Sequence, residues 1–434
     1  MVKIIGAGLA GCEAAYYLAN QKIDVKLYEM RPKKMTPAHQ TGDFAELVCS
    51  NSLRSDDIHN AVGLLKREME SFDSLIMKAA HYARVPAGSS LAVDRTLFSG
   101  YIKDALSKHP HIDIINEEVT EIDPECYTMI AAGPLASDDL SQSILDLFEA
   151  GNLHFYDAVA PIIEGDSIDM SICYLKSRYD KGEAAYINCP MDQNTYDKFY
   201  DMLIHAKTAE IKDFEKNVFE GCMPVEVMAS RGKETLLFGP LKPVGLEQPN
   251  QKRPHAVIQL RQDDAKKTMY NIVGFQTHLT WPEQKKLIQM IPGLENANIL
   301  RYGVMHKNTY LDSPKIMNQG YQTKKHPKIF FAGQISGVEG YVESAASGLN
   351  AAIQMHQYMI NQTINPLPET TMMGAMASYI STTNHAFVPM NANLGLLPQL
   401  TEKHPKKMRK ELYAKRALSD LDHYIKEVYP LGNH

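Results

Sequence analysis

The chain has 434 residues, of which 44% are hydrophobic and 22% are charged, and its formal net charge is −6. At roughly 150 residues per domain, this length predicts two or three domains. The acidic total excludes a protein whose whole surface attracts nucleic acid, so any RNA-binding site must be a local patch.

The sequence shows no pattern typical of export, membrane insertion or metal binding. No apolar run approaches the roughly 18 residues of a membrane span, and the N-terminus enters a strand at VKII without a signal-peptide pattern. The six cysteines include no C-x-x-C pair, so neither a zinc knuckle nor a dithiol redox motif fits. We therefore expect a cytoplasmic protein with reduced thiols, no membrane partner and no metal.

A nucleotide-binding pattern opens the chain. Residues 2–30, VKIIGAGLAGCEAAYYLANQKIDVKLYEM, predict a strand, a glycine-rich turn, a helix and a second strand. Gly6 permits the tight turn, Gly8 lets the backbone approach a pyrophosphate, and Gly11 lets helix and strand pack closely. Glu29 follows Gly11 by 18 residues, where a carboxylate can bind an adenosine ribose. An adenine dinucleotide is the predicted ligand of the whole turn: Gly6, Ala7, Gly8, Leu9, Ala10 and Gly11.

A cysteine stands among small polar residues a short distance beyond this pattern. In ELVCSNSLRS, Cys49 is followed by Ser50, Asn51 and Ser52. The thiol could be inert packing, a redox partner or a nucleophile. Asn51 and Ser52 could bind cofactor or substrate, or they could cap a helix starting near Ser55, which is a common role for Ser and Asn.

A second glycine-rich stretch decides between FAD and NAD. Residues 328–355, KIFFAGQISGVEGYVESAASGLNAAIQM, predict a strand, a turn and a long helix, as in the closing segment of glutathione-reductase-like FAD domains. No second complete G-x-G-x-x-G exists, so NADH or NADPH would visit only as a reductant. Glu343 and Ser344 either bind the flavin or only stabilise the helix N-terminus. The predicted FAD contacts in this stretch are Gly333, Gln334, Gly340, Tyr341, Glu343 and Ser344.

The predicted fold is α/β, with a Rossmann-type FAD-binding domain of the glutathione-reductase class, an inserted α/β domain and a helical C-terminal segment. The FAD domain is expected to be discontinuous, comprising residues 1–150 and 295–365. The insertion is expected at residues 151–294, and residues 366–434 should pack on the FAD domain. Within the insertion, strands are predicted at residues 234–240 (ETLLFGP), 255–262 (HAVIQLRQ) and 269–279 (MYNIVGFQTHL), and a helix at residues 197–216.

Six longer blocks together resemble the folate- and FAD-dependent tRNA (uracil-5-)methyltransferases of the TrmFO family. They are YEMRPKKMTPAHQTGDFAELVCSNSLRSDDIHNAVGLLKREM, VPAGSSLAVDR, YLKSRYDKGEAAYINCPM, FEGCMPVEVMASRGKETLLFGPLKPVGL, LRQDDAKKTMYNIVGFQTHL and FAGQISGVEGYVESAASGLNA. The resemblance extends from residue 1 to about residue 420. The related GidA flavoproteins share the FAD framework but are longer, with a large helical C-terminal domain.

The resemblance implies an enzyme that makes 5-methyluridine in RNA. Its carbon donor would be 5,10-methylenetetrahydrofolate, with reduced FAD carrying the methylene group and NADH or NADPH as the reductant. The target would be the T-loop uridine of tRNA; the alternatives are a ribosomal RNA uridine, a generic FAD oxidoreductase, or an RNA-binding factor that uses FAD structurally. Uracil carbon 5 becomes nucleophilic after a thiolate adds to carbon 6. By resemblance, Cys222 in EGCMPVEV is that nucleophile and Cys49 is a second catalytic thiol.

Further substrate contacts are predicted at charged residues, each of which could equally be structural or part of a solvated surface. Residues 402–416 contain seven Lys or Arg against two Glu, which suits contact with RNA phosphates. Arg178 and Lys181 are candidates for a phosphate or a folate glutamate tail, and Arg261 and His278 for the pocket wall. The candidates in the basic segment are Lys406, Lys407 and Arg409.

Overall fold

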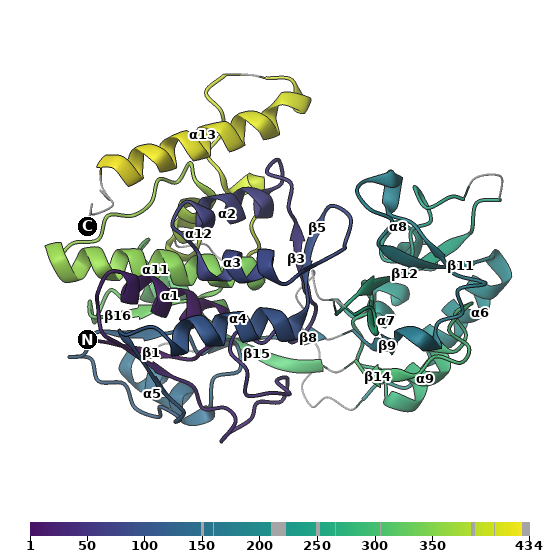
Figure 1. Cartoon of the computed structure of the whole chain (residues 1–434), viewed down its shortest axis with the longest axis horizontal. Helices are drawn as coiled ribbons and strands as arrows, with labels where there is room; N and C mark the ends of the chain where they lie inside the picture. The colour runs from purple at the N-terminus through teal and green to yellow at the C-terminus, as the bar shows by residue number, and fades with distance from the viewer. Residues whose placement is uncertain are drawn as a thin grey trace.

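The computed structural model describes residues 1–148, 152–158, 160–209, 223–248, 252–264, 266–303, 305–382, 387–402 and 404–427. Two bodies lie side by side in Figure 1. The larger one contains the beginning and the end of the chain, and the smaller one contains its middle, so the chain leaves the first body and returns to it.

A five-stranded parallel sheet forms the centre of the larger body. Its order is β16 (Ile329–Phe331), β7 (Thr128–Ile130), β1 (Val2–Ile5), β2 (Val25–Tyr28) and β6 (Ile112–Ile115). Strands of a parallel sheet are covered on both faces, which is why β1 is an unbroken apolar run apart from Lys3. The turn after β1 therefore lies at the carboxyl edge of the sheet, where α/β proteins bind nucleotides.

Two helices cross at this edge. They are α1 (Leu9–Asn20), which follows the glycine turn, and α11 (Tyr341–Asn361). A Cβ on Gly348 of α11 would lie 2.2 Å from the carbonyl oxygen of Ala10, so the two backbones touch there. This close approach places the N-terminal half of α11 against the start of α1.

Other helices and a small sheet cover the larger body. The three-stranded sheet has the order β3 (Ser52–Ser55), β5 (Ser90–Val93), β4 (Arg84–Val85). The helices are α2 (Ala61–Glu70), α3 (Leu75–Tyr82), α4 (Arg95–Ser107), α5 (Asp138–Phe148), α10 (Ser313–Ile316), α12 (Met372–Ser381) and α13 (Lys406–Glu427). Helix α13 packs on this body through buried Ala417 and Leu421 and through Tyr424, whose hydroxyl donates to the carbonyl of Asn365.

The smaller body has a six-stranded sheet. Its order is β10 (Tyr174–Leu175), β11 (Tyr186–Met191), β12 (Ala256–Gln262), β13 (Met269–Ile272), β9 (Ile162–Glu164) and β14 (Ile299–Arg301). Its helices are α6 (Gln193–His205), α7 (Val225–Ser230), α8 (Thr235–Phe238) and α9 (Trp281–Ile288). An antiparallel ribbon of β8 (Asn152–Ala158) and β15 (Met305–Leu311) carries the chain between the bodies.

Four local predictions are wrong. The helix predicted at residues 197–216 is α6, which begins at Gln193 and ends at His205, and residues 210–216 lie outside the described residues. ETLLFGP contains helix α8 rather than a strand, because only Leu236 of its apolar residues is fully buried while Phe238 is 81% exposed. The strand predicted at residues 269–279 ends at Ile272, since Gly274 has a φ of +71° that leaves the extended conformation. No helix starts near Ser55: residues 52–55 form strand β3, and α2 starts at Ala61.

The predicted α/β class with a parallel sheet is confirmed. Within the described residues, every helix is too short or too polar to span a bilayer.

Candidate functional site

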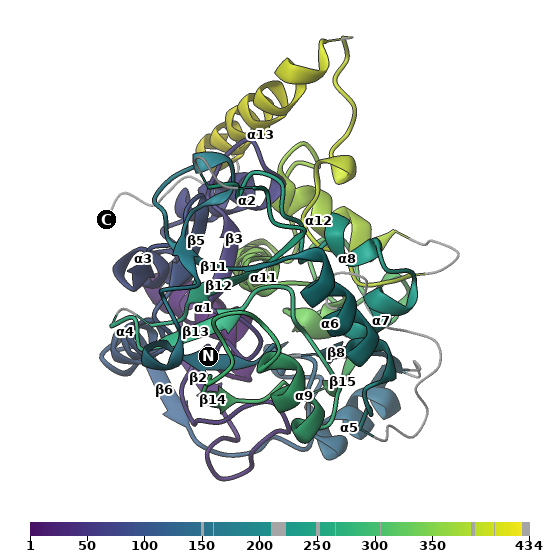
Figure 2. The same ribbon diagram turned by 90° about the vertical axis from the view of Figure 1, so that its right-hand side faces the viewer.

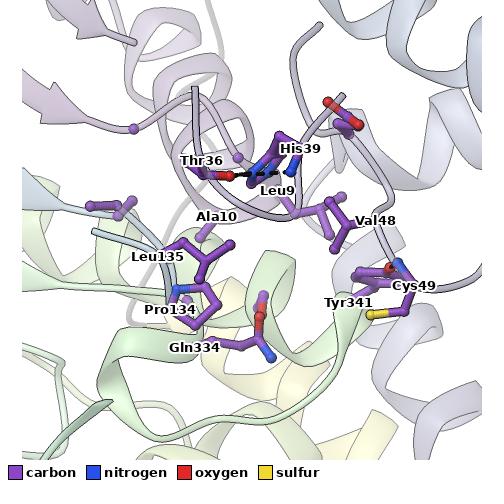
Figure 3. A pocket seen from close by; sticks show the side chains of 18 of the residues that line it. Leu9, Ala10, Thr36, His39, Val48, Cys49, Pro134, Leu135, Gln334 and Tyr341 are labelled. Carbon is purple, nitrogen blue, oxygen red and sulfur yellow. Dashed lines mark hydrogen bonds between the residues drawn. The ribbon is translucent and has the colours of Figure 1, made fainter. Parts of the chain in front are cut away.

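A cavity of about 670 Å³ opens at the carboxyl edge of the parallel sheet, and residues of both bodies line it. Figure 3 shows Thr36, His39, Leu135 and Pro134 around one part of it, with Cys49 and Tyr341 beside each other at the far side. Thirteen predicted site residues line this one cavity: Gly6, Gly8, Leu9, Ala10, Glu29, Cys49, Ser52, Arg261, Gly333, Gln334, Gly340, Tyr341 and Ser344.

The glycine turn leaves room for a ligand at one position only. Gly6 has a φ of +102°, and a Cβ there would lie 2.5 Å from the Ala131 carbonyl oxygen. A Cβ on Gly11 would lie 1.9 Å from the carbonyl oxygen of Gly6. A Cβ on Gly8, by contrast, would meet no atom within 4 Å. Gly6 and Gly11 are therefore required by the fold, whereas the space beside Gly8 suits the pyrophosphate of a dinucleotide.

Glu29 lies beside the turn as a buried carboxylate. Its Oε2 accepts a hydrogen bond of 2.9 Å from the amide of Ala7, and its Oε1 accepts one of 2.9 Å from Nε of Arg31. Burial alone would raise the pKa of Glu29, but the hydrogen bonds and positive charge of Arg31 outweigh it and hold the pKa below its ordinary value. An ionised Glu29 facing the cavity suits a ribose diol and repels a 2′-phosphate.

The loop that carries Cys49 is fixed from two sides. From the larger body, the hydroxyl of Tyr341 accepts hydrogen bonds from the amides of Cys49 (2.7 Å) and Ser50 (3.3 Å). From the smaller body, Arg261 donates from Nε to Oδ1 of Asn51 (2.9 Å) and from Nη2 to Oγ of Ser50 (2.6 Å). Burial raises the pKa of Tyr341 well above its ordinary value and lowers that of Arg261. In Figure 3 the Cys49 thiol points into the space near Gln334.

Asn51 is a structural contact rather than an open polar group. It is fully buried, and its amide donates to the carbonyls of Val93 (3.0 Å) and Gln262 (2.8 Å) while its oxygen accepts from Arg261. Ser52 lines the cavity, but its hydroxyl accepts from the amide of Arg54. The Asn51 side chain thus joins the two bodies behind Cys49.

Two further arginines contact the same loop. Arg95 donates from Nη1 to the Leu47 carbonyl (2.7 Å) and forms an ion pair of 3.1 Å with Asp263 of the smaller body. Arg301, at the end of β14, donates to the Val48 carbonyl. Burial, together with the charge of Arg95, lowers the pKa of Arg301. Neither arginine was predicted from the sequence, because no local motif marks it.

The start of α11 forms the other wall. The Gly333 amide donates to Oγ of Ser347 (2.7 Å), and Nε2 of Gln334 donates to Glu339 (2.9 Å). Glu343 is fully buried and is not among the lining residues; its Oε1 accepts from the Ala392 amide (2.9 Å) and from Arg54. Ser344 does line the cavity, with its side chain nearly buried.

Other predicted substrate residues lie away from the cavity. Arg178 donates to the Lys242 carbonyl and to Gln259 inside the smaller body, and Lys181 lies on an exposed turn. His278 is nearly buried, and its ring lies against the Glu226 carboxylate. At the start of α13, Arg409 is exposed and donates to the His404 carbonyl; the side chains of Lys406 and Lys407 lie outside the described set.

Cys222 also lies outside the described residues. The chain resumes at Met223 and Pro224, both buried, and the Val225 amide donates to the carbonyl of Gln276 at 2.8 Å. Gln276 lines the cavity. The described residues that follow Cys222 therefore contact the cavity wall.

No metal centre is found in this part of the molecule. Among the described ranges, no three His, Cys, Asp or Glu side chains gather as a metal site would require. The cavity wall offers instead backbone amides, the two buried carboxylates of Glu29 and Glu339, and several guanidinium groups.

The sequence matches one family model and several named proteins over most of its length. The family model described as glucose inhibited division protein A matches residues 1–363. A protein of Acholeplasma laidlawii named methylenetetrahydrofolate–tRNA-(uracil-5-)-methyltransferase TrmFO is 64% identical over 425 residues, covering 98% of this chain and 99% of that protein. The chain belongs to the TrmFO family. Proteins of the same name from Staphylococcus epidermidis (59% identical; 98% of each chain) and Bacillus velezensis (57%; 98% and 99%) match similarly.

Solved structures confirm the fold. Aquifex aeolicus GidA in one crystal form superposes with a TM-score of 0.72 at 16% identity, covering all of this chain and 76% of that one. A second crystal form of the same protein superposes with a TM-score of 0.69, covering 97% of this chain and 73% of the GidA chain. The glutathione-reductase-like class with an insertion, predicted from the sequence, is therefore confirmed, and the GidA chain is longer as expected.

Proposed function

We propose that the protein methylates carbon 5 of a uridine in tRNA, using 5,10-methylenetetrahydrofolate as carbon donor, bound FAD as redox cofactor and NADH or NADPH as reductant. The observation that carries this proposal is the meeting of the glycine turn, Glu29 and Cys49 in one cavity. The names of the highly similar TrmFO relatives supply the donor and the substrate class.

The chain's own residues divide into two groups around the cavity. The Gly8 turn and Glu29 would hold the pyrophosphate and ribose of FAD, and Gly333 after β16 and Ser344 at the start of α11 would contact the rest of the cofactor. The redox chemistry that FAD would supply when bound is the transfer of two electrons from NAD(P)H to the one-carbon unit. That unit would leave tetrahydrofolate and replace the hydrogen on uracil carbon 5, which departs as a proton. This balance requires no metal and no further oxidant.

The thiols would act on the pyrimidine ring. Cys222 is the proposed nucleophile for uracil carbon 6, because a soft thiolate adds and leaves readily, and Cys49 is the proposed second catalytic thiol. Guanidinium groups around the Cys49 loop support this assignment, since positive charge favours a thiolate and an enolate oxygen alike. Among them, Arg261 lines the cavity and donates to Ser50, the residue after Cys49.

Reconstitution tests the proposal directly. Purified protein with bound flavin is incubated with NAD(P)H, methylenetetrahydrofolate labelled in its methylene carbon, and either tRNA or ribosomal RNA lacking 5-methyluridine. We expect a labelled methyl group on the tRNA T-loop uridine that disappears without folate. Label on ribosomal RNA would keep the chemistry and change the target, whereas flavin reduction without any label in RNA would leave only a generic flavoprotein.

Variants of the two thiols complete the test. Cys222→Ala and Cys49→Ala should abolish label transfer while keeping FAD, because neither thiol belongs to the glycine turn. Cys126→Ala is the matched control, since Cys126 is an exposed cysteine that does not line the cavity.

A further inference from the structure

Outside the cavity, the smaller body carries a stacked aromatic pair. The rings of Trp281 and Tyr302 lie 5.3 Å apart between centroids and are inclined by only 12°. Trp281 is the only tryptophan of the chain, and it is 59% exposed. Neither ring lines the cavity. An exposed flat aromatic surface of this kind is typical of a binding surface rather than of a core.

The pair is built on a rigid support. Trp281 is the first residue of α9, and Tyr302 follows the last residue of β14. Gln284 of α9 is buried; it donates to the Gly303 carbonyl (2.9 Å) and accepts from the Gly303 amide (2.8 Å). Figures 1 and 2 show α9 and β14 at the same end of the smaller body. The residue after Tyr302 is therefore tied to the helix that begins with Trp281, so the stack is preorganised.

The stack lies within a short distance of the catalytic cavity. Arg301, which precedes Tyr302, donates to the carbonyl of Val48, a lining residue. Gln276, another lining residue, precedes Trp281 by five residues, so their Cα atoms are at most about 18 Å apart along the chain. A uridine bound in the cavity would thus leave its flanking nucleotides near this stack.

Three exposed lysines lie on segments next to Trp281. Lys285 and Lys286 of α9 are exposed, and Glu283 forms an ion pair with Lys286. Lys207 is also exposed, and its carbonyl accepts a hydrogen bond from the amide of Thr280 beside Trp281. An aromatic face among lysines is the combination that binds single-stranded nucleic acid, because bases stack on the ring and lysines neutralise phosphates.

We propose that the Trp281–Tyr302 stack binds an unpaired base that flanks the target uridine of the RNA substrate. This inference rests on the proposed function, because it assigns part of the RNA site of the same enzyme. Folate does not fit the stack as well, since its reactive ring must enter the cavity and the stack lies outside it.

The single tryptophan makes the inference directly measurable. Holoenzyme is titrated with tRNA lacking 5-methyluridine while the fluorescence of Trp281 is followed; stacking of a base on the indole should quench it. Trp281→Ala should weaken RNA binding by roughly ten- to a hundredfold, as expected for loss of one stacked base. Trp281→Phe keeps a ring and should stay within a few-fold of the parent, measured by filter binding.

A matched control separates stacking from general exposure of an aromatic ring. Phe238 is 81% exposed on α8 of the same body, so Phe238→Ala should leave RNA affinity unchanged. Flavin reduction by NAD(P)H should be the same in all variants, because it needs no RNA. Unchanged fluorescence at saturating RNA, or wild-type RNA affinity in Trp281→Ala, would overturn the inference even if the parent enzyme methylates tRNA. A parent enzyme that binds RNA with quenching but transfers no methyl group would contradict only the proposed function.

Discussion

Replacing Arg261 tests whether the smaller body positions the Cys49 loop. Its guanidinium donates to Asn51 and Ser50, and Asn51 is fully buried, so Arg261→Met leaves the Asn51 oxygen without this donor. Hydrogen bonds from a charged donor contribute about 1.5–3 kcal/mol each, and a buried unsatisfied acceptor costs about 1–3 kcal/mol. Removing a buried charge offsets part of this loss. We expect a net loss of unfolding free energy of about 2–4 kcal/mol.

Arg261→Lys should lower the rate of methyl transfer much more than it changes FAD content or the rate of flavin reduction. Arg261→Lys keeps the charge but cannot reach two acceptors as a planar fork. We expect it to lower methyl transfer at least about tenfold, since small displacements of reacting groups have effects of that size. FAD content and the rate of flavin reduction should stay near those of the parent. A double-mutant cycle with Asn51→Ala should give a coupling energy of about 1–3 kcal/mol.

Arg178→Lys is the control for this experiment. Arg178 also donates to several acceptors inside the smaller body, but none of its described partners belongs to the Cys49 loop. It should therefore destabilise the protein while methyl transfer per folded molecule is kept. If Arg261→Lys transfers methyl groups as fast as the control, or if its coupling to Asn51 is near zero, the positioning role is refuted.

Three further predictions concern the glycine turn, Glu29 and Cys49. Gly8→Ala should fold normally but lose FAD on purification, because the new Cβ meets no protein atom and enters the proposed ligand space. Gly11→Ala should lower the melting temperature, because its Cβ would collide with the backbone carbonyl of Gly6. Glu29→Gln breaks the buried ion pair with Arg31 and should lower the free energy of unfolding by about 3 kcal/mol at pH 7. Since the folded pKa of Glu29 is depressed, this difference should persist above about pH 4.3 and narrow as the pH falls further, measured by thermal unfolding. Cys49→Ser should keep the backbone hydrogen bonds of its loop and the FAD but lose methyl transfer, while Cys126→Ser keeps both.

The sequence was most informative where a function depends on neighbouring residues. Gly6, Gly8 and Gly11 lie within one turn, and Glu29 directly follows the adjacent strand, so their spacing alone brings these residues close together. The start of α11 also lies at the cavity, because the strand and turn before it return to the parallel sheet.

Side-chain contacts between segments far apart in the sequence could not be predicted from local motifs. Arg95 and Arg301 reach the Leu47 and Val48 carbonyls through side chains that no local pattern marks. Glu343 was predicted as a flavin contact, but it is buried against Ala392. Its role depends on a segment some fifty residues away, and helix periodicity says nothing about such a partner.

The polar residues after Cys49 illustrate why the alternatives drawn from sequence were incomplete. Ligand binding and helix capping were both considered for Asn51, yet its amide joins Val93 of one body to Gln262 of the other, and its oxygen accepts from Arg261. Moving the smaller body away from the larger one must therefore break hydrogen bonds one or two residues from the Cys49 thiol. The position of that thiol and the approach of the two bodies are consequently coupled, so the cavity is complete only when the bodies are together.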